Sequence, residues 1–266
     1  MRDLRYDGGM PYESDLEIAL SIARQAGDLT LRYFEQETAT DEKADQSPVT
    51  IADRESESLI CRLLGEHFPG DGILGEEGAS APSRTGRRWI IDPIDGTRDF
   101  VRRTQFWSIQ IALEAGGRVV LGIIHLPCLG ETFYATDGCG CFCNGRRTRA
   151  SDISRIDKSI LMISGFQDVW QTWPPDAVRY LTENCWTVRG YSGCYDVTMI
   201  ARGKADIWLS GNGQEWDYAP AAIIARECGA RFITRAGDDR IDVMHCLICT
   251  PGLEAELRRI LGIGIP

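Results

Sequence analysis

The stretch WIIDPIDGT, residues 89–97, places two aspartates directly after a short apolar run. The run Trp89–Ile91 predicts a buried strand, and Pro93 and Gly96 predict a sharp turn after it. Because Asp92 and Asp95 flank that proline, we expect both carboxylates to face one point. Hard cations such as Mg²⁺ prefer oxygen ligands of this kind. The segment therefore predicts a core strand that ends in a metal site.

Three further acidic segments are set among turn-forming or aromatic residues. They are Asp53 after Thr50, the pair Glu76 and Glu77 after Gly75, and Asp217 after Trp216. Taken singly, an acid in such a place is more often a helix cap, a turn former or a solvated charge. Four or five carboxylates gathered together would repel one another unless cations were bound between them. The joint occurrence of these segments therefore indicates metal binding.

The composition excludes several classes of protein. The 266 residues are 43% hydrophobic and 26% charged, as in an ordinary globular enzyme, and the formal net charge is −10. This acidic balance argues against binding to nucleic acid or to an anionic membrane surface. No apolar run reaches the roughly 18 residues of a membrane span, and the first twelve residues lack the apolar core of a secretory signal. We therefore expect a cytoplasmic location.

The ten cysteines and three histidines do not indicate covalent or zinc chemistry. Without an export signal, reduced thiols are expected. Cys246 and Cys249 form a CxxC pair, but a zinc site needs four converging ligands, which the spacing of the other cysteines does not predict. None of the histidines lies in an acidic segment, and no cysteine, Cys143 of Cys-Asn-Gly-Arg-Arg included, is expected to lie in a phosphate-binding turn of the P-loop kind. A phosphohistidine or phosphocysteine intermediate is not expected.

Apolar periodicity predicts two kinds of organisation along the chain. The first part has helices over 13–35 and 51–67, a loop over 71–88, and strands over 89–91, 108–114, 118–125 and 131–136. The second part alternates strands over 160–164, 186–189, 205–209, 231–234 and 246–250 with helices over 175–184, 195–202, 216–229 and 253–261. We therefore expect an N-terminal α+β half, residues 1–154, and a C-terminal α/β half, residues 155–266, joined in one compact unit.

Three motifs together resemble those of the inositol monophosphatase superfamily. They are Gly-Glu-Glu at 75–77, Asp-Pro-Ile-Asp-Gly-Thr at 92–97, and Trp-Asp at 216–217 before a small-residue helix that ends at Gly229. The segment GCGCFCNG, residues 138–145, resembles a further glycine turn of that family. The likeness covers almost the whole chain. It implies an α/β fold of the inositol monophosphatase and fructose-1,6-bisphosphatase type, a layered α/β/α/β/α sandwich with the site between the halves, and a homodimer.

The resemblance also implies a role for each acidic motif. Glu76, Asp92 and the backbone carbonyl of Ile94 would bind a first Mg²⁺, and Asp92, Asp95 and Asp217 a second. A third, weaker ion would lie near Glu76, so that two or three ions are expected. These implied ligands account for every acid of the three motifs except Glu77.

The same resemblance places the catalytic groups around Thr97. Thr97, with Asp53 behind it, would orient a metal-bound water and help to deprotonate it, and Glu76 would take part through its metal ion. The backbone amides of Gly96 and Thr97, at a predicted helix start, would meet the phosphate oxygens. The implied reaction is hydrolysis of a small phosphorylated metabolite without a covalent intermediate.

Features around the motifs are similar to the histidinol-phosphate phosphatase branch. They are Arg98-Asp99-Phe100 directly after Thr97, Trp107 before a strand, and Gly193–Asp196 ahead of residues 201–206. Inositol phosphatases carry a glutamate seven residues before the Trp-Asp aspartate, where this chain has Ser210. Histidinol phosphate is therefore the expected substrate, and acids are expected near its ammonium and imidazole groups. Asp99, Asp196 and Glu215 are the candidates, and Arg98 is a candidate for the phosphate.

Other functions remain open on the same residues. One is an inositol-1-phosphate phosphatase, or a broad phosphatase of sugar phosphates or 3′-phosphonucleotides. Another, of a different class, is a non-catalytic metal- or metabolite-binding protein on the same scaffold. That last hypothesis is disfavoured because every acid that the first coordination shell requires is present.

Overall fold

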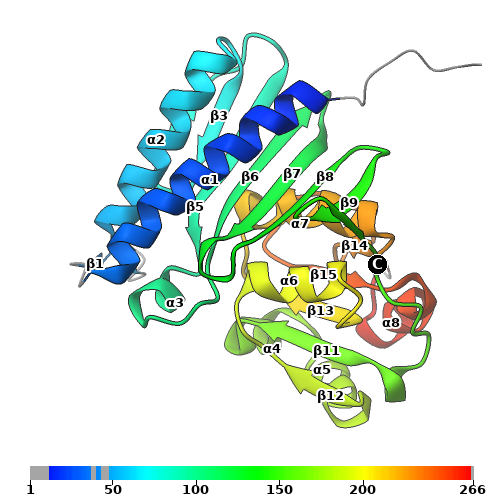
Figure 1. Ribbon diagram of the computed structural model, residues 1–266. Coiled ribbons are helices and arrows are strands. Elements are labelled where there is room, and N and C mark those ends of the chain that lie inside the picture. Colours follow the sequence, from blue (N-terminus) through cyan, green and yellow to red (C-terminus); the bar gives the residue numbers. More distant parts are fainter. Residues whose placement is uncertain (1–11, 37–39, 43–47, 265–266) are drawn as a thin grey trace, which may run out of the picture.

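The computed structural model describes residues 12–36, 40–42 and 48–264, and Figure 1 shows how their elements are arranged. Residues 1–11, on which the expectation about a secretory signal rests, lie outside the described residues. In the described part of the chain, no helix combines the length and the apolar character that crossing a membrane requires.

Two helices, α1 (Glu13–Glu35) and α2 (Ile51–His67), form one outer layer, with the bounds that the apolar periodicity predicted. The N-terminus of α2 is fixed by a capping box. The Thr50 hydroxyl accepts a hydrogen bond from the Asp53 amide at 3.2 Å, and Asp53 Oδ2 accepts one from the Thr50 amide at 2.8 Å. The two helices pack on each other and cover one face of a sheet, α1 over β6 and β7 and α2 over β5.

That sheet has eight strands in the order β10-β9-β8-β7-β6-β5-β3-β4, antiparallel except for β3 beside β5. Its strands are β3 (Gly72–Gly75), β4 (Ser80–Ala81), β5 (Arg87–Asp95), β6 (Ser108–Ala115), β7 (Arg118–Leu126), β8 (Glu131–Thr136), β9 (Gly140–Cys143) and β10 (Arg146–Thr148). A separate pair is formed by β1 (Thr40–Glu42) and β2 (Pro48–Thr50). The prediction of a loop over 71–88 was wrong for β3 and β4, because β3 becomes a strand by pairing with β5 and β4 by pairing with β3.

A second sheet has five strands in the order β12-β11-β13-β15-β14. They are β11 (Ile160–Ser164), β12 (Thr187–Arg189), β13 (Ile207–Ser210), β14 (Arg231–Ile233) and β15 (Cys246–Cys249). The helices of this part are α4 (Phe166–Thr172), α5 (Pro175–Asn184), α6 (Gly193–Ala201), α7 (Glu215–Cys228) and α8 (Glu254–Leu261), and α3 (Thr97–Val101) follows β5. Short 3-10 turns are η1 (Pro127–Leu129), η2 (Ile156–Lys158) and η3 (Pro251–Leu253).

The elements stack in five layers, which confirms the predicted α/β/α/β/α sandwich. Helices α6 and α7 lie between the two sheets, and α4, α5 and α8 cover the far face of the second one (Figure 1). Strand β5 is buried on both faces, because Ile91 packs under α1 and α2 while Ile90 packs in the middle layer. A strand covered on both sides reads as a continuous apolar run, which explains the run before Asp92.

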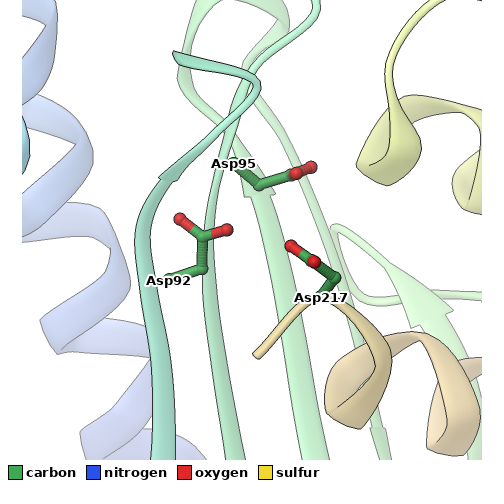
Figure 2. A group of neighbouring side chains, drawn as sticks. All are labelled: Asp92, Asp95 and Asp217. Carbon is green, nitrogen blue, oxygen red and sulfur yellow. The ribbon is translucent and has the colours of Figure 1, made fainter. Parts of the chain in front are cut away.

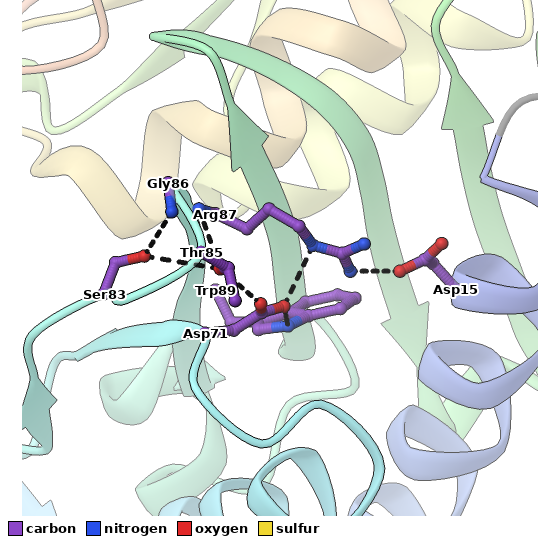
Figure 3. Close-up of polar contacts among 7 residues, drawn as sticks. All are labelled: Asp15, Asp71, Ser83, Thr85, Gly86, Arg87 and Trp89. Carbon is purple, nitrogen blue, oxygen red and sulfur yellow. Dashed lines mark hydrogen bonds and ion pairs between the residues drawn. The ribbon is translucent and has the colours of Figure 1, made fainter.

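A polar network fixes the start of β5 (Figure 3). Asp71 Oδ1 accepts a hydrogen bond from the Thr85 hydroxyl at 2.7 Å, and its Oδ2 accepts two at 3.0 Å, from Arg87 Nε and Trp89 Nε1. Arg87 also pairs with Asp15 of α1. The segment before β5 is thereby held to the outer helix layer, at the opposite end of the strand from the acidic turn.

Helix α7 belongs to the C-terminal part of the chain but packs closely on the first sheet. A Cβ atom at Gly122 of β7 would lie 2.5 Å from Ile223 Cγ2 and 2.9 Å from Pro220 Cα. Only a glycine lets the helix approach the strand to this distance. The boundary expected at residue 154 falls between β10 and β11, and the division into halves stays a prediction.

Candidate active site

Three aspartates from two segments converge in the middle of the molecule. Asp92 and Asp95 lie on β5 and Asp217 lies in the first turn of α7, and one carboxylate oxygen of each lies within 4.8 Å of the others (Figure 2). In a regular strand, residues three apart point to opposite faces. Between Asp92 and Asp95 the pairing of β5 with β6 shifts by one residue, and this bulge brings both carboxylates to the same site.

A backbone amide orients each of the three carboxylates. The Ile94 amide donates to Asp92 Oδ1 at 3.0 Å, and the Gln214 amide donates to Asp217 Oδ2 at 2.6 Å. Asp95 Oδ2 accepts a hydrogen bond at 2.9 Å from the Cys194 amide, at the start of α6. The end of β5 and the first turns of α6 and α7 therefore meet at one point.

The electrostatics of the cluster fit a divalent cation. Burial raises the pKa of Asp92 well above its ordinary value, and the charges of Glu76, Asp95 and Asp217 raise it further. The pKa of Asp217 is likewise raised by burial and by its acidic neighbours. Burial also raises the pKa of Asp95, against the hydrogen bonds from Cys194 and Gln110. A bound cation reverses this repulsion, and an all-carboxylate donor set is the kind that Mg²⁺ takes.

Glu76 lies beside this group of three rather than within it. Its charge raises the pKa of all three aspartates, and its backbone amide donates to the Ile91 carbonyl at 3.2 Å. The turn that carries Glu76 is thus attached to β5 one residue before Asp92. The Ile94 carbonyl accepts a hydrogen bond from the Thr97 hydroxyl at 3.3 Å.

Asp53 is fully buried at the start of α2, and only one of its two oxygens is used. The Thr50 amide and hydroxyl both donate to Oδ2, whereas Oδ1 is buried and accepts no hydrogen bond from the described residues. Burial raises the pKa of Asp53 to about 6, although the bonds from Thr50 lower it. Strand β2, which ends at Thr50, packs against α3, which begins at Thr97. The Thr97 hydroxyl itself donates to Ile94 and not to Asp53.

Two connected cavities open beside the carboxylates. The larger, about 370 Å³, is lined by residues that include Glu76, Asp95, Gly96, Thr97, Arg98, Asp99, Tyr191, Ser192 and Gly193. The smaller, about 210 Å³, shares Asp95 and Arg98 with it and reaches Asp217, Ser210 and Gln110. Gly96 has φ +87°, and a Cβ there would lie 2.9 Å from Ser192 Oγ and 3.0 Å from the Phe106 carbonyl. A side chain at this position would be strained and would clash.

Among the predicted substrate contacts, Arg98 and Asp99 line the larger cavity. Arg98 is exposed, and it borders both cavities. Asp99 is half-buried and accepts a hydrogen bond from the Thr104 hydroxyl, and burial raises its pKa. A ligand bound in the larger cavity could contact these two side chains with its organic part or its phosphate.

Asp196 and Glu215 do not line either of these cavities. Asp196 is fully buried behind the loop that precedes α6, where it accepts hydrogen bonds from the Ser164 hydroxyl at 2.8 Å and the Tyr191 amide at 3.2 Å. Glu215 forms a two-bond ion pair with Arg88, at 3.1 and 3.2 Å, and lines a separate cavity that includes none of the three aspartates. Both side chains therefore have partners within the protein, and the structure brings neither of them into the two cavities.

Two residues of the site were missed by the sequence analysis. Gln110 of β6 is paired with Asp92, is buried, and hydrogen-bonds to Asp95. A glutamine inside the apolar run of residues 109–113 is the signal that marks it. Cys194 hydrogen-bonds to Asp95 through both its backbone amide and its thiol.

Comparisons with known proteins agree with this geometry. A family model described as the inositol monophosphatase family matches residues 12–261. The histidinol-phosphatase of Chlorobaculum parvum is 38% identical over 216 residues, 81% of this chain and 83% of that protein. The histidinol-phosphatase of Mycobacterium tuberculosis is 35% identical over 233 residues, 84% of this chain and 88% of that protein. The crystal structure of the extragenic suppressor protein suhB from Bartonella henselae superposes with a TM-score of 0.87 at 26% identity, covering 95% of this chain and 100% of that one.

Proposed function

The chain belongs to the inositol monophosphatase family and is a phosphoric monoester hydrolase, and we propose that it is a Mg²⁺-dependent phosphatase that converts histidinol phosphate to histidinol and phosphate. The observation that carries the metal dependence is the convergence of Asp92, Asp95 and Asp217. The choice of substrate is supported by the two histidinol-phosphatases that the chain resembles. The pathway implied by that substrate is histidine biosynthesis.

We assign the binding of two or three Mg²⁺ ions to the acidic cluster. Asp92, Asp95 and Asp217 are the central ligands, and Glu76 and the Ile94 carbonyl are the further ones that the family resemblance implies. When bound, the cations activate a water molecule and neutralise charge on the phosphate. The raised pKa values of the three aspartates support this assignment, because buried carboxylates that repel one another are stabilised by a cation.

We assign proton handling to Thr97 and Asp53. The buried Oδ1 of Asp53 has an acceptor position to offer, and β2 packs against α3, which carries Thr97. Rotation of the Thr97 hydroxyl away from the Ile94 carbonyl would make it available to a water held above the aspartates. In this assignment Asp53 acts through Thr97 and does not touch the ester.

The larger cavity is our candidate for the substrate. Gly96, Thr97 and Arg98 line it, and in this assignment the backbone amides of Gly96 and Thr97 and the positive charge of Arg98 would meet the phosphate. Asp99 supplies a negative charge for the ammonium or the imidazole of histidinol. In the smaller cavity the Ser210 hydroxyl shares a hydrogen bond of 2.9 Å with the Tyr218 hydroxyl, so that a neutral pair stands where inositol phosphatases carry a glutamate.

The test is release of phosphate from a panel of esters in Mg²⁺, each with an EDTA control. The panel contains histidinol phosphate, inositol-1-phosphate, 3′-phosphoadenosine 5′-phosphate, fructose-1,6-bisphosphate and glycerol phosphate. Asp92→Asn protein, purified in the same way, measures any contaminating phosphatase. We expect a dominant rate on histidinol phosphate that EDTA abolishes.

Other outcomes separate the parts of the proposal. A preference for inositol-1-phosphate, which the family match favours as the second candidate, would keep the metal site and replace the substrate. A flat profile would indicate a broad phosphatase of sugar phosphates or phosphonucleotides. Turnover that persists in EDTA would remove the metal dependence. We further propose that the enzyme acts in the cytoplasm and that it is a homodimer. Light scattering of the purified protein tests the oligomeric state.

A further inference from the structure

Glu57 is a buried acid of α2 to which the assignments above give no role. It lies one helical turn after Asp53 and is 5% exposed. Its Oε2 accepts a hydrogen bond from the Glu77 amide and its Oε1 accepts one from the Ala79 amide, both at 2.9 Å. Both oxygens of this carboxylate are therefore engaged by the backbone of the turn that carries Glu76.

The turn over residues 75–79 is closed around the Glu57 carboxylate. The Gly75 amide donates to the Ala79 carbonyl at 2.7 Å, and Gly78 has φ +105°. A Cβ at Gly75 would lie only 2.2 Å from Glu57 Oε2. Gly75 is not in the left-handed region, so the glycine of the Gly-Glu-Glu motif is explained by the closeness of this carboxylate and not by its backbone conformation.

Glu76 lies between two attachment points of its turn. On one side its own amide is bonded to the Ile91 carbonyl of β5 at 3.2 Å, and on the other side the amides of Glu77 and Ala79 are bonded to Glu57 of α2. The direction of the Glu76 side chain relative to Asp92 is therefore set jointly by β5 and α2. Loss of either attachment frees the turn to move relative to the aspartates.

We propose that Glu57 is a positioning residue, whose carboxylate holds the Gly75–Ala79 turn so that Glu76 completes the cation site with the three aspartates. This inference rests on the proposed metal site. A neutral side chain of the same size does not replace it. A glutamine offers one acceptor oxygen and one NH₂ group, which would meet the second backbone N–H donor to donor. A buried negative charge beside two other acids costs stability. The carboxylate is nevertheless suited to this place, because it offers two acceptor oxygens, one for each backbone N–H of the turn.

The direct test is Glu57→Gln, with Mg²⁺ affinity measured by titration calorimetry on the purified full-length protein without any ester. Partners that orient a metal ligand typically change affinity by roughly 10- to 100-fold when they are removed, and we expect a loss in this range. In kinetics the half-saturating Mg²⁺ concentration should rise by the same factor, while the KM for the ester at saturating Mg²⁺ stays within about twofold of the wild-type value.

Glu227 offers a matched control far along α7 from Asp217. Its two oxygens accept hydrogen bonds from the Gly138 and Gly140 amides, at 3.0 and 2.8 Å, in the turn between β8 and β9. Glu227→Gln therefore breaks the same kind of carboxylate-to-turn contact at a place without any site residue. We expect it to lower the melting temperature comparably and to leave Mg²⁺ affinity unchanged.

A second variant approaches the contact from the other side. Gly75→Ala puts a methyl group against Glu57 Oε2 and should weaken Mg²⁺ binding as Glu57→Gln does. The proposal is overturned if either variant binds Mg²⁺ as tightly as the wild type does, or if Glu227→Gln weakens binding equally. A wild-type protein that binds Mg²⁺ but hydrolyses no ester would refute the proposed function. The role of Glu57 would still be decided by the same Mg²⁺ titration of wild type and Glu57→Gln. A wild-type protein that binds no divalent ion would refute both.

Discussion

The fold brings Asp92, Asp95 and Asp217 together, and without a bound cation their mutual repulsion lowers the stability of the protein. Replacing Asp92 with asparagine removes one charge and keeps an oxygen that accepts the Ile94 amide bond. We expect phosphate release to fall by about a thousandfold or more, because a central ligand is lost. In EDTA the melting temperature of this variant should equal or exceed that of the wild type, since repulsion in the cluster is relieved.

Phosphate release and calorimetry in EDTA check the two halves of this prediction. A matched control is Asp157→Asn, which alters an exposed acid paired with Arg155 outside the site. That variant should keep its activity. Asp92→Asn protein with wild-type turnover would contradict the assignment of Asp92 as a ligand.

Asp196 makes a prediction about pH. Burial raises its pKa from 3.8 to about 7. The folded chain therefore keeps a proton that the unfolded chain has released, and the stability that this group contributes is lost as pH rises from about 4 through about 7. The side-chain amide of the Asp196→Asn variant cannot ionise. The free energy of unfolding of the wild type, minus that of the variant, should fall across this range and level off above about pH 8.

Urea denaturation of both proteins at each pH, in constant Mg²⁺, gives this difference directly. Parallel curves would show that the environment of Asp196 does not favour its neutral form. The same variant checks the substrate contact that the sequence suggested. An unchanged KM for the ester is expected, because the carboxyl group is bonded to Ser164 and to the Tyr191 amide.

At the scale of elements, the position of Asp217 depends on how closely α7 lies on β7. In the Gly122→Ala variant the added methyl group would push against Ile223 and Pro220, which should lower the free energy of unfolding by about 1–3 kcal/mol. Since α7 carries Asp217, Mg²⁺ affinity should fall as well. Gly65→Ala is the comparison, because nothing lies within 4 Å of a Cβ at that exposed position of α2. Gly65→Ala should raise the free energy of unfolding by roughly 0.5–1 kcal/mol, because alanine has the higher helix propensity, and it should leave Mg²⁺ affinity unchanged.

Chemical denaturation and Mg²⁺ titration of the two alanine variants measure these effects. If Gly122→Ala is as stable as Gly65→Ala, the close packing of α7 on β7 does not hold in solution. If it is unstable but binds Mg²⁺ normally, α7 adjusts without moving Asp217.

At the scale of the whole molecule, bound cations should join the first sheet to the middle helix layer. Asp92 and Asp95 come from β5, and Asp217 comes from α7. Mg²⁺ at about 100 times its Kd adds about 2.7 kcal/mol to the free energy of unfolding. For a chain of this size, that corresponds to a rise of about 5 to 10 °C in the melting temperature. Scanning calorimetry in EDTA and in Mg²⁺ measures the shift, which should be greatly reduced in Asp92→Asn protein. Identical melting curves in EDTA and Mg²⁺ would exclude a cation bound at this junction.

Local features of the fold follow from the amino-acid sequence alone. The bounds of α1 and α2 follow from apolar residues at helical spacing, and the double burial of β5 follows from its uninterrupted apolar run. The closeness of Asp92 and Asp95 is also local, but the turn predicted after Ile91 is wrong, because β5 continues through a bulge to Asp95. The family resemblance implied that Asp217 joins these two aspartates.

The way in which distant segments meet depends on packing between elements. The sequence placed Asp196 and Glu215 beside the substrate, whereas packing directs Asp196 toward Ser164 and Glu215 toward Arg88. The sequence did not reveal strand β3 or the role of Glu57, because each depends on contacts between residues that are about 15 to 22 positions apart in the chain. The physical reason is that periodicity specifies which face of an element is apolar, whereas the direction of a polar side chain depends on which other element packs beside it.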